Sequence, residues 1–531
     1  MDRATVEAGR LVRGECAEPD ATQPQGRRWV GVTGLLPAGT AIAAQSLIEV
    51  DTTGARLALK VDLDDNWSIT PTIMGQQQKS EGGFAVDPQV GELALTHFYP
   101  ETSDDRWWQA ALTVEGRIGN FDLTYVFSHM KRDVDSESDY SDYGFWYDTL
   151  AGYGAYFYDD NGDYINPAQY IQAVDGYKRT SHELRIASPQ DRRFRMVAGL
   201  FWQEQSHDIF QRYKVDGLTS DFEVPGYSDT IWLTAQQRKD RDEAVFGELA
   251  YDLTDSLTVT GGIRWFKARN SLKGFFGYSA GYSSGTGEAA CFDQTDFNGA
   301  PCINLDKKVD ESGTIGKANL TFQVDDTKMV YVTWSEGFRP GGINRRGTLL
   351  PYLSDYLTSI ELGWKMRLAD GRLIFNGAVF EQDWEDFQFA ILGQNGLTEI
   401  KNANQARIRG LEADLNWAAT YNLTISAGVA FYDAELSENY CGFTDPDGNP
   451  VTDCADPEAP SGTQLPVTPK FNGNATVRYQ FPVIPSNIGP VNEPLWRDCQ
   501  LNVKFKDFNA GQRYQLHELK NVYRNLERQR N

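Results

Sequence analysis

The chain has 531 residues, of which 40% are hydrophobic, and a formal net charge of −24 at pH 7. This charge disfavours nucleic acid as a partner, because neutralisation of phosphates by Lys and Arg dominates nucleic-acid affinity. Mean hydropathy is −0.49, and the sequence has no run of the ~20 apolar residues that a spanning helix needs, which excludes a helical membrane protein.

Residues 1–50 are expected to form an irregular N-terminal segment, because they lack the alternation found further along the chain. The stretch 27–44 loosely resembles a signal peptide, with a basic start, an apolar middle and small residues at Ala41 and Ala43. A proline and two glycines interrupt its apolar part. We therefore favour a loop-like segment over a cleaved signal.

Apolar and polar residues alternate along much of the chain from about residue 55 to 481. The pattern is cleanest at 257–267 (LTVTGGIRWFK), 411–417 and 422–433. In the first stretch one face carries Leu257, Val259, Gly261, Ile263 and Trp265. A period of two predicts strands with one apolar and one polar face.

The connections between these strands alternate between short and long. Short polar turns are expected at 65–66, 117–120, 189–192, 253–256, 324–327, 368–371 and 418–421. Long connections are expected at about 75–106, 132–180, 204–240, 268–312, 339–355, 384–406 and 434–469. About fifteen strands of ~10 residues with this turn asymmetry predict an all-β, antiparallel up-and-down transmembrane barrel.

A barrel follows because lipid cannot satisfy the backbone groups of an open sheet edge. In such a barrel Leu423, Ile425, Val429 and Phe431 would face lipid, while Thr424 and Ser426 would face the lumen. The competing interpretation is a secreted propeller, which also uses short strands. Propeller blades repeat a motif at a fixed period, whereas the long connections here differ in length and composition.

The long connection near residues 133–170 combines many acids with many aromatic residues. It contacts a ligand from an outer loop, or it forms an interfacial girdle or a self-packed loop; the sequence leaves these alternatives open. The candidates for ligand contact in this region are Trp146, Tyr147, Tyr156 and Tyr158.

GYSAG at 277–281 and GYSSG at 281–285 fit the G-x-S-x-G nucleophile elbow of α/β-hydrolases. An elbow needs a buried strand before the serine and a helix after it. Ser279 and Ser283 instead lie in a loop rich in Gly, Ser and Tyr. We therefore expect no catalytic site and no enzyme.

Four of the six cysteines form two close pairs, Cys291 with Cys302 and Cys441 with Cys454, each in a polar long connection. Their spacing suits loop disulfides on the cell-exterior side of the barrel. The sequence has no C-x-x-C, and none of its five histidines pairs with another at metal-ligand spacing. We expect neither a metal nor a cofactor.

The stretch YVTWSEGFRPGGINRRG at 331–347 begins as an alternating strand and ends in glycines and arginines. It lacks the G-x-x-x-x-G-K-[ST] spacing of a phosphate loop. We expect the strand to leave the barrel here on the long-loop side, with Arg339, Arg345 and Arg346 as candidates for ligand contact.

Several segments together resemble the TonB-dependent outer-membrane receptors. Besides SEGFRPGGINRR at 335–346, they are SHELRIAS at 181–188, AVFGELAYDLTDSLTVTGGIRWF at 244–266, SIELGWKMRLADGRLIFNGAVFEQDWEDFQ at 359–388, NANQARIRGLEADLNW at 402–417 and LPVTPKFNGNATVRYQF at 465–481. No single segment is highly specific, but they occur in the family's order. The resemblance covers most of residues 50–481.

The resemblance implies a 22-stranded, plugged barrel in the outer membrane of a Gram-negative bacterium. It also implies a receptor that imports a scarce nutrient, such as an iron-siderophore, cobalamin or a glycan, energised through TonB. The implied partners are outer-membrane lipid, a small-molecule nutrient and, in the intact family member, the TonB energy-coupling complex.

The chain departs from the family at both ends. The part before the first strand is too short for a plug domain, we find no coupling box, and the family's last strands are not evident after Phe481. We therefore expect a partial barrel at 51–482, followed by a basic non-barrel tail at 483–531. The alternative functions are a passive porin-like channel and a non-functional receptor fragment.

Overall fold

The computed structural model describes residues 42–44, 49–83, 95–142, 157–278, 290–392, 398–445, 449–483 and 495–506. Its elements are β1 (Ile42–Ala44), β2 (Glu49–Ala58), β3 (Val61–Asp62), β4 (Ser68–Glu81), β5 (Leu95–His97), β6 (Thr102–Ile118), β7 (Phe121–Asp139), β8 (Tyr170–Ala187), β9 (Phe194–Lys214), β10 (Thr230–Asp252), β11 (Leu257–Tyr278), β12 (Leu305–Asp325), β13 (Lys328–Arg339), β14 (Asp355–Leu368), β15 (Leu373–Leu392), β16 (Thr398–Ala418), β17 (Leu423–Leu436), β18 (Phe471–Val483) and β19 (Leu495–Lys506). In these ranges no helix is long and apolar enough to cross a bilayer.

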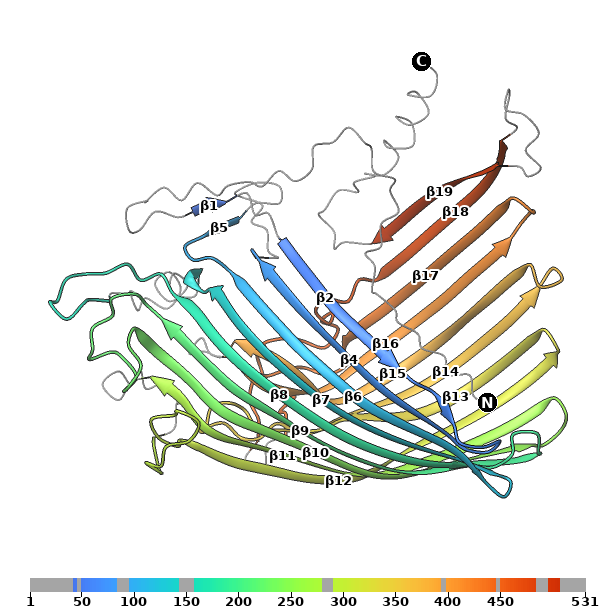
Figure 1. Ribbon diagram of the computed structural model, residues 1–531, viewed down its shortest axis with the longest axis horizontal. Coiled ribbons are helices and arrows are strands. Elements are labelled where there is room, and N and C mark those ends of the chain that lie inside the picture. The colour runs from blue at the N-terminus through green and yellow to red at the C-terminus, as the bar shows by residue number, and fades with distance from the viewer. Residues whose placement is uncertain are drawn as a thin grey trace, which may run out of the picture.

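All but two of these strands form one curled antiparallel sheet (Figure 1). Strands β2 and β3 follow one another along β4, so the described part of the sheet has 16 up-and-down strands. Strands β1 and β5 pair separately. The predicted all-β, antiparallel up-and-down architecture is confirmed.

The sheet extends further along the chain than the sequence suggested. Strand β19 pairs with β18 over twelve residues, so the predicted non-barrel tail cannot begin at residue 483. Around the sheet β19 comes next to β2, but the described residues give no hydrogen-bonded register between these two strands. The sheet is therefore curled without being closed.

Side chains alternate between the two faces of the sheet as the sequence predicts. On β11, Ile263 is 62% exposed and Trp265 is 45% exposed. The next residue, Phe266, points to the concave face and is 2% exposed. On β17, Val429 and Phe431 are exposed as well. Rows of exposed apolar side chains on a strand's outer face are what a transmembrane barrel presents to lipid.

The expected strand length of ~10 residues was also wrong. The longest strand, β10, has 23 residues rather than ~10. Antiparallel pairing needs no lipid, so hairpins continue as regular ladders above the apolar band. The long connection expected at 384–406 is for this reason mostly strand, because β15 runs to Leu392 and β16 starts at Thr398.

Aromatic rings cover glycines on the neighbouring strand at several positions of the inner wall. Tyr331 of β13 lies directly opposite Gly363 of β14, and a Cβ at Gly363 would overlap its ring. The Tyr331 hydroxyl donates to Glu361 at 2.7 Å, which holds the ring in place. Phe246 and Gly199 repeat the arrangement between β10 and β9. Such cross-strand pairs fix strand register.

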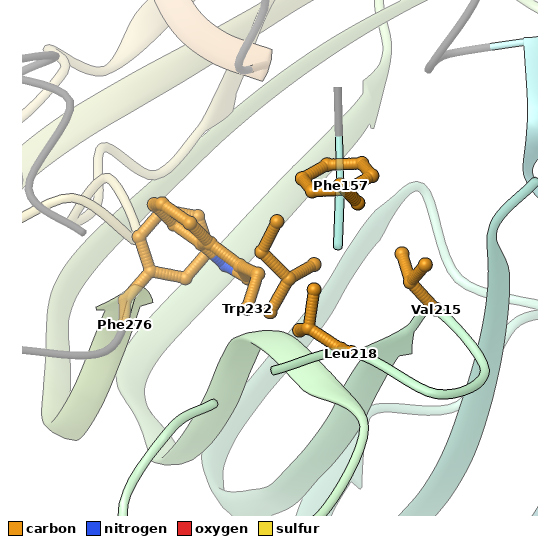
Figure 2. Close-up of a cluster of buried hydrophobic side chains, with 6 residues drawn as sticks. Phe157, Val215, Leu218, Trp232 and Phe276 are labelled. Atoms are coloured by element: carbon orange, nitrogen blue, oxygen red, sulfur yellow. The ribbon is translucent and has the colours of Figure 1, made fainter. Parts of the chain in front are cut away.

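The buried core lies at the long-loop end of the sheet. One cluster joins the loop residues Phe157, Val215 and Leu218 to Trp232 and Phe276, at the ends of β10 and β11 (Figure 2). The Trp232 and Phe276 rings meet edge to face, with centroids 4.6 Å apart. Loops packed in this way form a defined surface on which a ligand site can be built.

Candidate functional site: the strap and the chamber beneath it

Residues 340–354, between β13 and β14, turn into the concave side of the sheet; we call this segment the strap. Its consecutive residues contact strands that are far apart in the sheet. Asn344 Nδ2 donates to the Ile400 carbonyl of β16 at 3.0 Å, and Asn344 Oδ1 accepts from the Ile400 amide at 2.8 Å. Arg345 Nη1 donates to Gln211 Oε1 of β9 at 3.1 Å.

Strands β9 and β16 are seven places apart in the sheet, or roughly 34 Å along its surface at ~4.8 Å per strand. Two adjacent residues can reach both strands only from the inside of a tightly curled sheet. The strap therefore runs as a chord across the concave side.

Further hydrogen bonds hold the strap on the β10–β12 flank. The Ile343 amide donates to Asn270 Oδ1 of β11 at 3.0 Å, and Gln236 Nε2 of β10 donates to the Arg345 carbonyl at 2.9 Å. From β12, Lys307 Nζ donates to the Leu349 carbonyl at 2.9 Å.

On the opposite flank the strap carries a buried ion pair. Arg346 Nη2 lies 2.5 Å from Glu399 Oε1 of β16, and these side chains are only 9% and 8% exposed. Lys401 Nζ lies 3.6 Å from the other Glu399 oxygen. Removing one member of a buried ion pair leaves a desolvated charge, which makes the pair a strong determinant of the strap's position.

Arg339, the last residue of β13 before the strap, also pairs with a carboxylate. Its Nη2 lies 2.5 Å from Asp355 Oδ2, and it donates to the Gln388 carbonyl at 2.9 Å. The Asp355 side chain is 2% exposed. This pair joins the adjacent ends of β13 and β14 where the strap leaves the wall.

Arg345 differs from the other two arginines. Its side chain is exposed, and no carboxylate lies within ion-pair distance of it in the described residues. The guanidinium lies beside the inner wall of β8 and β9, where Tyr177 stacks on His207 with ring centroids 4.0 Å apart. Of the three arginines predicted to contact a ligand, Arg345 is the one whose charge is available.

A chamber of about 290 Å³ lies between the strap and the inner wall. The strap contributes Gly341 and Tyr352, and the wall contributes mainly polar side chains, among them Gln203, Gln205, Arg238, Asp240, Asp242 and Glu311. Tyr352 accepts from Arg238 Nη2 at 3.2 Å, which connects the strap to the chamber wall. Donors and acceptors on several strands can fix the orientation of a polar ligand.

The aromatic loop near residue 150 is only partly described. Trp146, Tyr147 and Tyr156 lie outside the described residues. The Tyr158 ring packs against Phe222 and Tyr164, with centroids 5.6 and 5.9 Å away. For Tyr158 this packing favours the self-packed loop over ligand contact.

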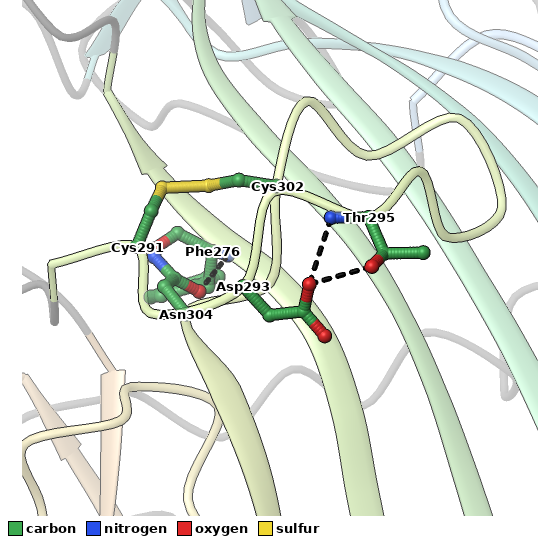
Figure 3. The surroundings of a disulfide bond; sticks show 6 residues. All are labelled: Phe276, Cys291, Asp293, Thr295, Cys302 and Asn304. Carbon is green, nitrogen blue, oxygen red and sulfur yellow. Dashed lines mark hydrogen bonds between the residues drawn. A yellow bond between two sulfur atoms is a disulfide. The ribbon is translucent and has the colours of Figure 1, made fainter.

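Both cysteine pairs are joined as disulfides. Cys291 and Cys302, both in the C-terminal half of the β11–β12 loop, are joined with Cα atoms 5.9 Å apart; Figure 3 shows the bond. Cys441 and Cys454 link the β17–β18 loop with Cα atoms 6.1 Å apart. Both loops lie at the strap end of the sheet, where Cys302 is buried in a second apolar cluster.

Another tie between loops was not visible in the sequence. The hydroxyls of Tyr99 and Tyr170 donate to the two oxygens of Asp216, at 3.3 and 2.9 Å. Burial, reinforced by Asp216, raises the pKa of Tyr99 well above its usual range. The phenol thus stays protonated at neutral pH and joins the β5–β6 connection, through Asp216, to the β9–β10 loop and the first residue of β8.

Comparison with known proteins places the chain in a family. The family model of the TonB dependent receptor-like β-barrel matches residues 60–527. The pesticin receptor of Yersinia enterocolitica is 25% identical over 240 residues, which are 44% of this chain and 31% of that protein. The probable TonB-dependent siderophore receptor PiuA of Acinetobacter baumannii is 24% identical over 180 residues, 32% of this chain and 22% of that protein.

Solved structures show the same fold. The ferric yersiniabactin uptake receptor FyuA from Yersinia pestis superposes with a TM-score of 0.59 and 14% identity, covering 82% of this chain and 57% of that one. The siderophore receptor PiuA from Acinetobacter baumannii gives 0.59 and 16%, covering 82% and 63%. The chain spans less than two thirds of the length of these relatives. It belongs to the TonB-dependent receptor family, whose members are Gram-negative outer-membrane β-barrel proteins.

Proposed function

We propose that this barrel serves an outer-membrane receptor that binds and imports a small, negatively charged nutrient of the iron-siderophore kind. Family membership supports a receptor, and relatives named for ferric yersiniabactin and for siderophores support the ligand class. Import would be energised through TonB, as in intact family members. No enzymatic role has support from the family.

The observation that carries the ligand class is the charge of Arg345, which faces no carboxylate in the described residues and belongs to the same strap that lines the polar chamber. Arg346 and Arg339 each face a carboxylate, so neither has charge to spare. An anionic ligand at the strap would gain a charge-assisted hydrogen bond from Arg345, of about 1.5–3 kcal/mol. Tyr177 and His207 would supply an aromatic surface beside it.

A binding assay tests this proposal. Cells that lack their own receptors would express the protein, and binding of radiolabelled ferric citrate, a ferric catecholate, ferric yersiniabactin and cobalamin would be measured. We expect a ferric complex to bind, and Arg345→Gln to weaken its binding about tenfold or more, since 1.4 kcal/mol corresponds to tenfold.

The matched control is Arg372→Gln in the β14–β15 turn at the other end of the sheet, where Arg372 donates to the Ala369 carbonyl. It should leave binding unchanged. Binding of cobalamin alone, or equal affinity in both variants, would contradict the proposed ligand class.

The alternative of a passive channel requires an unobstructed lumen. The strap occupies part of the concave side and is fixed to both flanks. This arrangement favours a receptor over a passive channel.

A further inference from the structure

We propose that the lipid-facing side of β8, β9 and β10 binds a phosphate group of an outer-leaflet lipid, held between Lys178 and Lys239 with Ser206 as a further donor. This site lies on the convex side of the sheet, whereas the strap and the chamber lie on its concave side. The proposal therefore goes beyond nutrient binding and does not depend on which nutrient is carried.

Lysines lie in register across neighbouring strands in the long-loop half of the wall (Figure 1). Lys178 of β8 and Lys239 of β10 both pair with Ser206 of β9, the strand between them. On the other side of β8, Lys131 of β7 pairs directly with Lys178. Like charges directly opposite one another destabilise a sheet. The row therefore carries a repulsion that a bound anion would relieve.

The strand register places this row on the lipid-facing side. Directly paired residues share a face of the sheet. Six residues nearer the short turns, the same register joins Leu184, Leu200 and Val245, which are 38%, 53% and 51% exposed. Side chains along a strand change face at every residue. An even separation therefore leaves the lysines on the same outer face as these apolar residues.

An aromatic pair indicates how high the row lies in the membrane. Trp202 of β9 lies on the outer face between the apolar row and the lysine row, with its ring 5.5 Å from that of His182 of β8. Aromatic side chains of this kind mark the membrane–water interface. Ser206 lies four residues further toward the long loops, about 10 Å higher at ~3.3 Å per residue and a strand tilt of ~40°. The lysine row is therefore level with lipid headgroups.

The charges of the two lysines are available. Both side chains are exposed, and in the described part of the chain no carboxylate lies within ion-pair distance of either. Arg407 on the outer face of β16 differs, because its Nε lies 2.8 Å from Asp383 Oδ1. The outer face thus offers unpaired cations on β8 and β10, and a paired one on β16.

Two carboxylates flank Ser206 on the same face of β9, and each has a donor or a cation of its own. Asp208 accepts from Gln237 Nε2 at 2.7 Å. Glu204 lies directly opposite Arg241 of β10. These two acids therefore do not neutralise the lysine row.

The spacing of the row suits one phosphate group. Lys178 and Lys239 are two strands apart, roughly 10 Å between backbones at ~4.8 Å per strand. Two long, flexible lysine side chains can converge on an anion across this gap, and the Ser206 hydroxyl lies beneath it. Lysine binds phosphate as a mobile point charge. The three side chains together supply charge and hydrogen bonds to several phosphate oxygens.

The test measures binding of lipid A, a lipid with two phosphate groups, to protein purified from outer membranes in a neutral detergent, by native mass spectrometry. Each lysine at an anionic membrane surface contributes about fivefold to affinity. Replacing both Lys178 and Lys239 by glutamine should therefore raise the dissociation constant at least tenfold, whereas replacing both by arginine should preserve binding. The control, Arg407→Gln, removes a paired base from the same face and should leave binding unchanged.

A footprint on the wild-type protein keeps the test decisive if the glutamine variant fails to fold. Saturating lipid A should protect Lys178 and Lys239 from chemical acetylation and leave Lys470, beside Asp433, reactive. Equal binding of dephosphorylated lipid A, or no protection of the two lysines, would overturn the proposal. Displacement of the lipid by millimolar inorganic phosphate would also overturn it, because the site would then take free phosphate.

Discussion

The membrane wall and the long-loop end of this molecule are specified by different kinds of information. In the wall each residue's place follows from its neighbours two positions away, so that Ile263 and Trp265 share the outer face. At the long-loop end the partners are distant in sequence, as with Arg345 and Gln211. Substitutions in the wall should therefore act through face and space, and those at the loop end through particular partners.

The largest expected effect tests the face rule. Val429→Arg on the outer face of β17 should destabilise the barrel by about 2–4 kcal/mol if the site lies near mid-bilayer. Ser426→Arg, on the inner face of the same strand, should be tolerated. Refolding into lipid vesicles under urea measures both, and equal effects would remove the distinction between the faces.

The disulfides test the loop end. Replacing both Cys441 and Cys454 by serine should cost about 3 kcal/mol of local loop stability, because a loop of this length gains roughly that from closure. Protease cleavage within the β17–β18 loop should rise while the wall remains intact. Mass spectrometry of unreduced peptides is the companion measurement, and crossed or free thiols would refute the pairing.

Filling the space beside an inner-wall aromatic ring should have a smaller effect on the free energy of unfolding. Gly363→Leu should cost about 1–3 kcal/mol, because the Tyr331 ring occupies the position of the new side chain. Gly261→Leu is the matched control, since a Cβ there meets nothing within 4 Å. If urea unfolding gives the same midpoint for both variants, the ring does not constrain the wall.

The smallest effect is a pH dependence in the β11–β12 loop. Hydrogen bonds from the Thr295 hydroxyl and amide, at 2.6 and 2.9 Å, hold the pKa of Asp293 below its usual range. A depressed pKa in the folded protein stabilises the loop at neutral pH, and this contribution is lost as pH falls below about 4. Proteolysis of the loop should rise in acid less steeply for Asp293→Asn than for Asp296→Asn.

Most of the wall was predictable from the sequence. Successive side chains of a strand point to opposite faces of the sheet, so a strand with one lipid-facing side shows apolar residues at every second position. The missed part, β19, carries the same signal: Leu501, Val503 and Phe505 alternate with Gln500, Asn502 and Lys504. The basic composition of the tail obscured it. Likewise Asn395-Gly396, a hairpin signal, lies in the connection that was predicted to be long.

The strap was predictable only in part. The sequence indicated an exit from the wall near Gly341 and three arginines of interest. It could not indicate that Arg346 would meet Glu399 or that Arg345 would meet Gln211 and no carboxylate in the described part of the chain, because those outcomes depend on how far the sheet curls. Neither Gln388 nor Asn402, which both donate to the Leu353 carbonyl, stands out in the chain.

The alternation of partners along Asn344, Arg345 and Arg346 restricts how the strap can change in length during evolution. Surface loops usually accept insertions and deletions freely. A single deletion between the neck and Arg345 would instead bring Arg346 toward β9 and leave Glu399 with Lys401 as its remaining ion-pair partner in the described residues. Natural length variation should therefore concentrate in residues 347–351, where hydrogen bonds reach the strap at backbone carbonyls that another residue can supply.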